Sequence, residues 1–396
     1  MTADSLTVRI RGVVNAEARS SSAPFAETIT IGTSAPRNCS SCGVEECFRH
    51  MPQRIDEIAF GRTACLVDEY WPEFDRYLCE IEQPHDLLLV PLDGRRFRKA
   101  GYAWSTGSFE HFRQSWRVTL HRAYRSRKLA MQGAARQKAL LAFNERLARS
   151  YASLLPYDVT HLIVMQNLLP WLWRDGHLGG RTFDVLMTAL PLSELHERLD
   201  RASAMHPESR TLADFRADES LVRMESEALK GARRIITPHS GIARLYEGRA
   251  ILIDWIVPIQ ASPAKAVDPC RPRIVLPAST VGRKGAYELR SALRGLDIDL
   301  TIVGAQHEGD DFWQGLSVER RRDADDWMDG ATAMVLPAHV EHRPRRLLEA
   351  VARGIPVIAS SACGLEHITG VITVPPGDVE ALRREIKSVV FAPRGA

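Results

Sequence analysis

The C-terminal third of the chain carries cations and carboxylates at spacings that suit the binding of a phosphorylated ligand. Arg283 and Lys284 directly follow Gly282, at the expected entry to a helix. Flexible backbone, helix N–H groups and two adjacent cations together form an anion-binding site. Further on, seven residues separate Glu341 from Glu349, and carboxylates beside a cationic cleft accept hydrogen bonds from sugar or ribose hydroxyls. We therefore expect a site that holds phosphate and hydroxyl groups together.

A second group of cations surrounds the start of a helix expected from Pro344, which suits a first helical position, to Gly354, which suits a left-handed terminator. Arg343, Arg345 and Arg346 stand at its N-terminal end. Positive charge there opposes the helix dipole unless an anion is bound. Two interpretations are open: the arginines hold an anion, or they point into solvent.

Four candidate metal ligands lie close together near the N-terminus: Cys39, Cys42, Cys47 and His50. This C-x2-C-x4-C-x2-H spacing suits a structural zinc site, with an iron–sulfur centre as a second candidate. Such ligands commonly come as two separated pairs, so unliganded thiols or a redox role are the alternatives.

An aromatic and glycine-rich segment of the N-terminal half is a candidate for sugar binding. Trp171 and Trp173 could stack on a sugar ring, or they could form a buried pair between domains. His177, His196 and His239 are better explained as hydrogen-bonded structural residues, and we assign no catalytic base to them.

The elements that must position these residues are clearest after residue 272. Short apolar runs alternate there with helical segments, which predicts an α/β domain with a parallel sheet of about five strands, covered on both faces. A weak helix is expected at 318–329, and stronger helices at 286–296, 344–353 and 378–390. Ligands bind at the carboxyl ends of such strands, which selects the loops 279–284, 304–312, 338–343 and 360–364.

The N-terminal half gives a weaker pattern. Its expected strands are 6–10, 64–67, 87–90, 161–164, 183–186 and 234–237. A helical stretch at 109–155, bent near Gly133, carries ten Arg or Lys from Arg113 to Arg149 but only one acid, Glu145. This basic segment indicates either docking to an anionic membrane surface or acidic acceptor, or a solvated helix face.

Length and composition set the wider limits. The 396 residues suggest two α/β domains, expected at 1–258 and 272–396 with a Pro- and Ala-rich linker at 259–271. A net charge of +3 is too small to indicate a nucleic-acid partner. The lack of a signal pattern or a membrane-length apolar run, together with an odd number of cysteines, predicts a cytoplasmic protein, with peripheral membrane contact as an open addition.

Five segments from 272 to 392 resemble, in order, the retaining GT-B glycosyltransferases typified by family 4. The stretch from Glu341 to Glu349 is similar to that group's E-x7-E element, and Val335-Leu-Pro-Ala is similar to the strand before it. Three further segments are similar to its donor-phosphate loop, its GG-x-x-E turn and its P-x-G-D stretch: Gly282-Arg-Lys-Gly, Cys363-Gly364-Leu-Glu and Val374-Pro-Pro-Gly-Asp. The sequence departs from the family pattern at His342, which stands where a glycine usually follows the first glutamate.

This resemblance implies a metal-independent glycosyltransferase with two Rossmann-like domains facing a central cleft. Arg283 and Lys284 would hold the donor diphosphate, Glu349 the ribose and Glu341 the transferred sugar, with no cofactor besides the nucleotide-sugar donor. The first domain would bind a glycan, lipid or small-molecule acceptor.

Three alternatives stay open. A non-catalytic GT-B scaffold would bind a nucleotide sugar or a partner subunit, and an epimerase or a phosphorylase would keep the fold but change the chemistry. A phosphorylase would need a pyridoxal lysine, for which none of the seven lysines lies in a convincing site.

Overall fold

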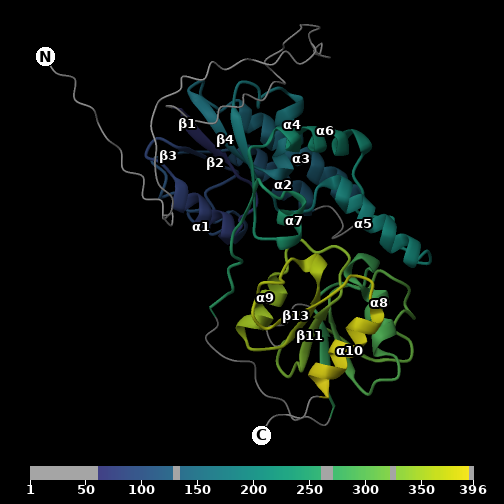
Figure 1. The fold of residues 1–396 in the computed structure, drawn as a ribbon. Coiled ribbons are helices and arrows are strands. Elements are labelled where there is room, and N and C mark those ends of the chain that lie inside the picture. Colours follow the sequence, from purple (N-terminus) through teal and green to yellow (C-terminus); the bar gives the residue numbers. More distant parts are fainter. Residues whose placement is uncertain (1–60, 128–133, 260–270, 322–326, 392–396) are drawn as a thin grey trace, which may run out of the picture. The chain divides into compact units, whose positions relative to one another are not determined.

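The first parallel sheet is built from short strands whose central members are almost wholly apolar. The computed structural model describes residues 61–127, 134–259, 271–321 and 327–391. Within these ranges the first sheet contains β1 (Arg62–Leu66), β2 (Leu87–Val90), β3 (His111–Gln114), β4 (Val159–Met165), β5 (Thr182–Leu186), β6 (Arg234–Thr237) and β7 (Ala250–Leu252). Their spatial order is β3-β2-β1-β4-β5-β6-β7 (Figure 1).

Helices connect these strands, as parallel pairing requires. They are α1 (Pro72–Ile81), α2 (Trp116–Arg127), α3 (Ala134–Ala152), α4 (Leu169–Arg174), α5 (Leu192–Met205), α6 (Glu219–Gly231) and α7 (Ser240–Leu245), with short 3-10 turns η1 (Ala100–Tyr102) and η2 (Gln166–Leu168). Local sequence fixes several helix starts. Pro72 begins α1, and the Asp218 carboxylate caps α6 by accepting from Ser220 N at 2.8 Å.

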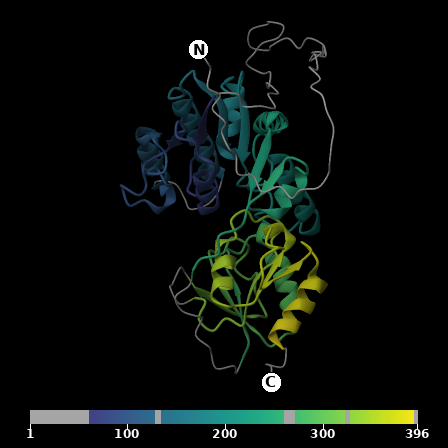
Figure 2. The ribbon, with the colours of Figure 1, turned by 60° about the vertical axis from the view of Figure 1, so that its left-hand side comes forward.

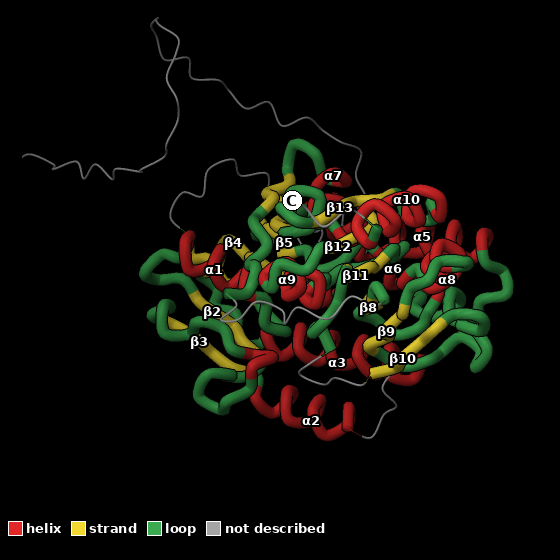
Figure 3. The backbone as a smooth tube through the Cα atoms, turned by 90° about the horizontal axis from the view of Figure 1, so that it is seen from below, coloured by secondary structure: helices red, strands yellow, loops and turns green. Residues whose placement is uncertain are grey.

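The second sheet repeats this design. It contains β8 (Arg273–Leu276), β9 (Asp299–Val303), β10 (Ser317–Arg321), β11 (Ala333–Leu336), β12 (Val357–Ser360) and β13 (Val371–Val374). All neighbours are parallel, in the order β10-β9-β8-β11-β12-β13, and this succession can be followed in Figure 3.

Helices α8 (Ala286–Leu293), α9 (Arg345–Ala352) and α10 (Val379–Val390) accompany this sheet, with the 3-10 turns η3 (Gly282–Lys284) and η4 (Ser361–Cys363). Figures 1 and 2 show α9 and α10 on opposite faces of the sheet. Arg383 Nη1 in α10 donates to Ala292 O in α8 at 2.7 Å, so these two helices lie together. Two Rossmann-like α/β units are therefore present, as the sequence predicts.

Most of the predicted strands are confirmed, but three segments differ. The expected helix at 318–329 is wrong at its start, because Ser317–Arg321 pairs with β9 as strand β10. The expected helix at 109–155 is likewise wrong at its start, where His111–Gln114 forms the edge strand β3. Strand β7 was not predicted from the sequence. The expected strand at 6–10 lies outside the described residues.

Two further points bear on the predicted organisation. Most of the predicted linker, 259–271, falls in the undescribed segment 260–270, so the domain boundaries stay a prediction. Among the helices in the described ranges, none has both the length and the apolar character needed to cross a bilayer.

Candidate functional site

The loops after β8 and β11 meet where the strand order of the second sheet reverses. Connections from β8 run towards one edge and those from β11 towards the other, which is where ligands bind in open α/β sheets. Backbone bonds join the loops, because His339 N and Val340 N both donate to Arg283 O, at 3.0 and 3.2 Å. The predicted cations and the first predicted glutamate are thereby held beside each other.

Gly285 makes this close approach of the two loops possible. Its φ is +75°, a left-handed conformation that side chains rarely adopt. A Cβ at this position would lie 2.0 Å from Pro337 O. Glycine is therefore required both for the turn into α8 and for the contact between the loops.

Lys284 and Glu341 form the central ion pair of the site. Lys284 Nζ lies 2.7 Å from Glu341 Oε2 and also donates to Val340 O at 3.2 Å. Both side chains are 13% exposed. Burial would raise the pKa of Glu341, but the Lys284 ammonium and the Arg343 N–H outweigh it and bring this pKa to about 2. Burial lowers the pKa of Lys284 although Glu341 opposes the shift.

The other predicted cations have partners of two kinds. The Arg283 guanidinium lies 4.5 Å from the ring centre of Phe215. Arg343 pairs with Glu69, while Arg345 donates to Glu73 Oε1 at 2.5 Å. Glu73 is buried, so its pairing with Arg345 is a fixed structural contact. The open question about these arginines is thus answered in part for Arg345, which points neither into solvent nor at a free anion site.

A cavity of about 310 Å³ brings most of the predicted donor-site residues together. Arg283, Lys284, Glu341 and Arg343 all line it. Glu349 lies outside its lining, four residues after Arg345 on α9, so it stands one turn further along the same helix face.

The two predicted glycines of the donor site have structural contacts. Gly282 N donates to Thr211 Oγ1 at 2.8 Å. Gly364 has a φ of +64°, and its carbonyl accepts from Trp255 Nε1 at 3.0 Å. A Cβ on Gly364 would come within 2.4 Å of the His239 ring.

Sequence analysis selected the loop that contains Glu308 but missed this residue. Its buried carboxylate accepts from Thr211 Oγ1 at 2.6 Å, from Ser209 Oγ at 2.7 Å and from Tyr287 OH at 3.0 Å. Gly282 N also lies 3.2 Å from its Oε1. Glu308 therefore fixes the start of the phosphate-type loop. No motif marks it, because its partners are distant in the sequence.

A larger cavity of about 600 Å³ borders the same loops. Arg283 and His342 line it from the second sheet's loops, and Asn167 and Trp171 from the segment after β4. The guanidinium of Arg174 lies 5.0 Å from the ring centre of Trp171. Arg283 thus belongs to the linings of both cavities.

The histidines that were interpreted as structural have matching contacts where the structure gives them. His239 is buried, and its Nδ1 accepts from Ile242 N at 3.3 Å at the start of α7. His196 Nε2 accepts from Ala217 N at 3.0 Å. Neither faces a nucleophile in the described part of the chain.

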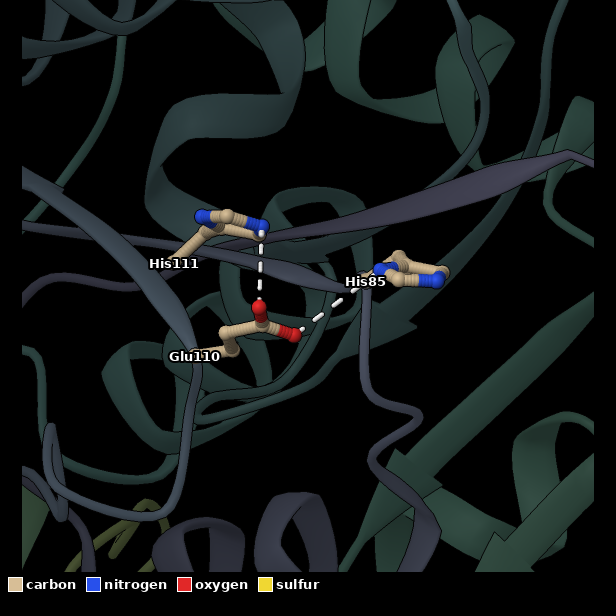
Figure 4. Close-up of side chains that lie close together, drawn as sticks. All are labelled: His85, Glu110 and His111. Carbon is tan, nitrogen blue, oxygen red and sulfur yellow. Dashed lines mark ion pairs between the residues drawn. The ribbon is translucent and has the colours of Figure 1, made fainter.

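Two His–Glu clusters occur among the described residues, and neither was predicted. His85, Glu110 and His111 are solvent-exposed, with nitrogen–oxygen distances of 3.8 and 3.9 Å (Figure 4). In the second cluster, His206 Nε2 and His339 Nε2 lie 2.6 and 2.9 Å from Glu288 Oε1. These are hydrogen-bond distances, so the ring nitrogens are engaged as donors to the carboxylate. The predicted ligands Cys39, Cys42, Cys47 and His50 lie outside the described residues.

Comparison with known proteins places the second half of the chain. Residues 283–390 match the model of the glycosyl transferases group 1 family. The comparison with curated proteins gives no match.

Solved structures with similar folds include three glycosyltransferase-type proteins. The lipopolysaccharide outer core galactosyltransferase WaaB is 14% identical with a TM-score of 0.46, and the match covers 83% of this chain and 90% of that one. Sucrose-phosphate synthase from Thermosynechococcus elongatus is 15% identical with a TM-score of 0.49, covering 84% and 90%. Anabaena Alr3699/HepE in complex with UDP is 12% identical with a TM-score of 0.46, covering 84% and 90%.

The two parallel-sheet α/β domains define the fold as GT-B. The match at 283–390 supports a transferase that carries a group 1 glycosyltransferase domain.

Proposed function

We propose that this protein transfers a sugar from a nucleotide-diphospho-sugar to an acceptor, with retention of configuration and without a metal ion. The observation that carries the proposal is the cluster of Arg283, Lys284 and Glu341 at the carboxyl ends of β8 and β11, inside the region matched by the family model. Cations and carboxylates at this edge of the sheet suit a donor with both phosphates and hydroxyls.

Departure of the nucleoside diphosphate is the step that this arrangement would assist. Two of the three Lys284 donors go to Glu341 and Val340 among the described residues, which leaves one for a phosphate oxygen. Arg283 and the N–H groups at the start of α8 add fixed positive charge. Preorganised charge of this kind stabilises a leaving phosphate without a metal ion.

The carboxylates would orient the donor. Glu341 would accept hydrogen bonds from hydroxyls of the transferred sugar, and Glu349, one turn along α9, would accept from the ribose. Retention is proposed on the resemblance to retaining enzymes, because no carboxylate in the described cavity is free of cation partners to act as an obvious nucleophile.

A non-catalytic scaffold is the second candidate, and one observation favours it. Lys284, Arg343 and Arg345 are each neutralised by a glutamate. Such pairs would have to exchange partners before these cations could bind phosphate. Donor binding without sugar transfer would distinguish a scaffold from an enzyme.

Thermal unfolding in the presence of UDP, GDP or ADP tests the donor site. A ligand that binds only the folded state raises the melting temperature by mass action. We expect one nucleoside diphosphate to raise it selectively, and Glu349→Ala to abolish the rise. Glu385→Ala is the matched control, since Glu385 is also a partly buried glutamate on a helix of the second domain. A flat panel at saturating ligand would contradict the proposal.

A further inference from the structure

The cavity of about 600 Å³ has walls that are mainly apolar. It opens at the carboxyl ends of β4 and β5, and its volume is typical of a small-molecule site. Apolar and aromatic lining residues come from several elements: Leu140, Leu141, Trp171, Leu190, Leu195 and Phe215. A ligand in this space would bury apolar surface.

Three polar atoms on lining residues have no hydrogen-bond partner among the described residues: Asn167 Oδ1, His307 Nε2 and His342 Nε2. Asn167 Nδ2 donates to Asp68 Oδ2 at 2.7 Å, which leaves the amide oxygen as an acceptor. Burial lowers the pKa of His342 to about 3, so its ring is neutral at physiological pH. Leaving a buried polar group unpaired costs about 1–3 kcal/mol, and a ligand with hydroxyl groups would satisfy these atoms.

The charged groups of the cavity do not suit a phosphorylated ligand. Arg283 is the one cation among the described lining residues, and two carboxyl groups, Asp214 and Glu225, accompany it. Both oxygens of Glu225 are engaged, with Gln166 Nε2 at 2.9 Å and Leu192 N at 2.5 Å. Burial raises the pKa of Glu225 to about 7. The cavity therefore offers little positive charge beyond the shared Arg283.

Phe215 is held in a strained conformation beside this cavity. Its φ is +70°, and Arg98 is the other non-glycine residue with positive φ in the described chain. Such strain persists where the surroundings enforce it and is concentrated at ligand sites. The ring is 41% exposed and supports the Arg283 guanidinium, so it stands between the two cavities.

We infer that this cavity binds a neutral, hydroxylated acceptor with an apolar or aromatic body, and that it excludes sugar phosphates. The role as acceptor rests on the proposed glycosyl transfer, whereas the preference among ligands rests on the lining alone. The hydroxyl groups would meet Asn167, His307 and His342, and the apolar body would contact the leucines, Trp171 and Phe215.

Calorimetric titration with three related probes tests this preference. Phenyl β-D-glucoside, D-glucose and glucose 6-phosphate share one sugar but differ in an aromatic ring or a phosphate. We expect phenyl glucoside to bind at least about tenfold more tightly than the other two, since burying an aromatic ring contributes roughly 1.5–3 kcal/mol. Glucose 6-phosphate binding as tightly as phenyl glucoside would overturn the inference.

Phe215→Asn tests whether the probe occupies this cavity. Asparagine tolerates positive φ, so the variant removes the ring without adding backbone strain. We expect it to weaken phenyl glucoside binding about tenfold. Arg98→Asn is the control, because it makes the same kind of change at an exposed position. Equal phenyl glucoside affinity in Phe215→Asn and the parent would contradict the inference.

The same protein samples separate this inference from the proposed function. Selective phenyl glucoside binding with no response to any nucleoside diphosphate would leave the cavity assignment standing and remove the transferase proposal. A nucleoside diphosphate response with no preference for phenyl glucoside would do the reverse.

Helix α2 carries a second, independent inference. Trp116 and Leu120 are 45% and 55% exposed and lie four residues apart on one face, with Tyr124, 57% exposed, one turn further on. Arg117 and Arg125 are exposed on the same helix. Residues 111–127 include no Asp or Glu. Figure 3 shows α2 beyond α3, at the outer side of the first domain.

The geometry points to an anionic lipid surface as the partner of this helix face. A basic helix with exposed Trp, Leu and Tyr inserts its apolar face at the headgroup boundary, and each nearby arginine contributes about 1 kcal/mol of attraction. The absence of acidic residues in this segment is the charge complement of such a surface. One arginine is excluded from this role, because Arg122 pairs with buried Asp68 at 2.7 Å.

Co-sedimentation with vesicles tests this contact. We expect binding to vesicles of phosphatidylcholine with phosphatidylglycerol, little binding to phosphatidylcholine alone, and weakening by salt. A Trp116→Ser/Leu120→Ser variant should lose most of the bound fraction. Leu252→Ser is the control, since Leu252 is 48% exposed on β7, at the opposite edge of the sheet. Equal sedimentation of parent and double variant would overturn the inference, as would a parent that does not bind.

Discussion

Lys284 is the residue on which the proposed chemistry depends most directly. Charge that develops on the leaving diphosphate would meet its ammonium at the start of α8, so its loss should affect the transition state more than the bound donor. We expect Lys284→Ala to lower kcat about 100-fold or more, the range found for loss of one charge-stabilising donor, with a much smaller change in donor KM. Release of nucleoside diphosphate from the donor measures both.

Lys230→Ala serves as the control for that substitution. Lys230 is 71% exposed and pairs with Glu227 within α6, so its removal takes away a lysine without touching either cavity. An unchanged kcat in Lys284→Ala would contradict the assigned role.

Sequence patterns locate the residues of the donor site that occur in contiguous motifs. Lys284 and Glu341 belong to two such segments, and the sheet rule predicts that these segments meet. Glu308 and Phe215 show the limit, because each acts through partners that the fold brings from afar. Glu308 contacts Ser209 and Thr211 in the other domain's connecting segment, and Phe215 contacts Arg283. No local spacing encodes such contacts.

At the scale of elements, the turn from η3 into α8 determines whether the phosphate-type loop can form. Gly285 and Gly295 provide a matched pair, since their φ angles are +75° and +73°. A Cβ on Gly285 meets Pro337 O at 2.0 Å, whereas nothing lies within 4 Å of one on Gly295. Alanine at 295 reports the backbone strain alone, about 1–2 kcal/mol.

We therefore expect Gly285→Ala to destabilise the protein by more than Gly295→Ala and to abolish the nucleoside diphosphate response. Urea unfolding and the thermal panel measure the two effects. If both variants lose the same stability and both still respond to the nucleotide, the close approach of the loops is not required.

Central strands are predictable from sequence because they are apolar on both faces, whereas edge strands are not. Every residue of β2 and β11 is buried, and both strands follow from short apolar runs. Strand β10 has the sequence Ser-Val-Glu-Arg-Arg and is mostly exposed, and β3 is similarly polar and exposed. Such edge strands are defined by pairing with one neighbour, and their composition favours a helix or a loop just as well.

At the scale of the whole molecule, contacts between residues far apart in the sequence connect the two α/β units. Arg345 pairs with Glu73, and His206 with Glu288. The Glu288 carboxylate accepts from His206, and this hydrogen bond raises the pKa of His206 above its ordinary value despite partial burial. The pair thus connects the end of α5 to α8 most strongly when His206 is protonated.

This pairing predicts how stability depends on pH. A histidine whose pKa is raised by folding adds stability that is fully present below about pH 6.5, its ordinary pKa, and is lost as the pH rises through the higher folded value. We expect His206→Gln to remove this alkaline loss from the urea-unfolding profile. His196 gives the opposite sign, because burial lowers its pKa, and His196→Gln should remove a loss that appears as the pH falls below 6.5. Identical alkaline profiles for the parent and His206→Gln would show that this contact does not couple protonation to folding, and the connection between the two units would then rest on the charge pair of Arg345 with Glu73.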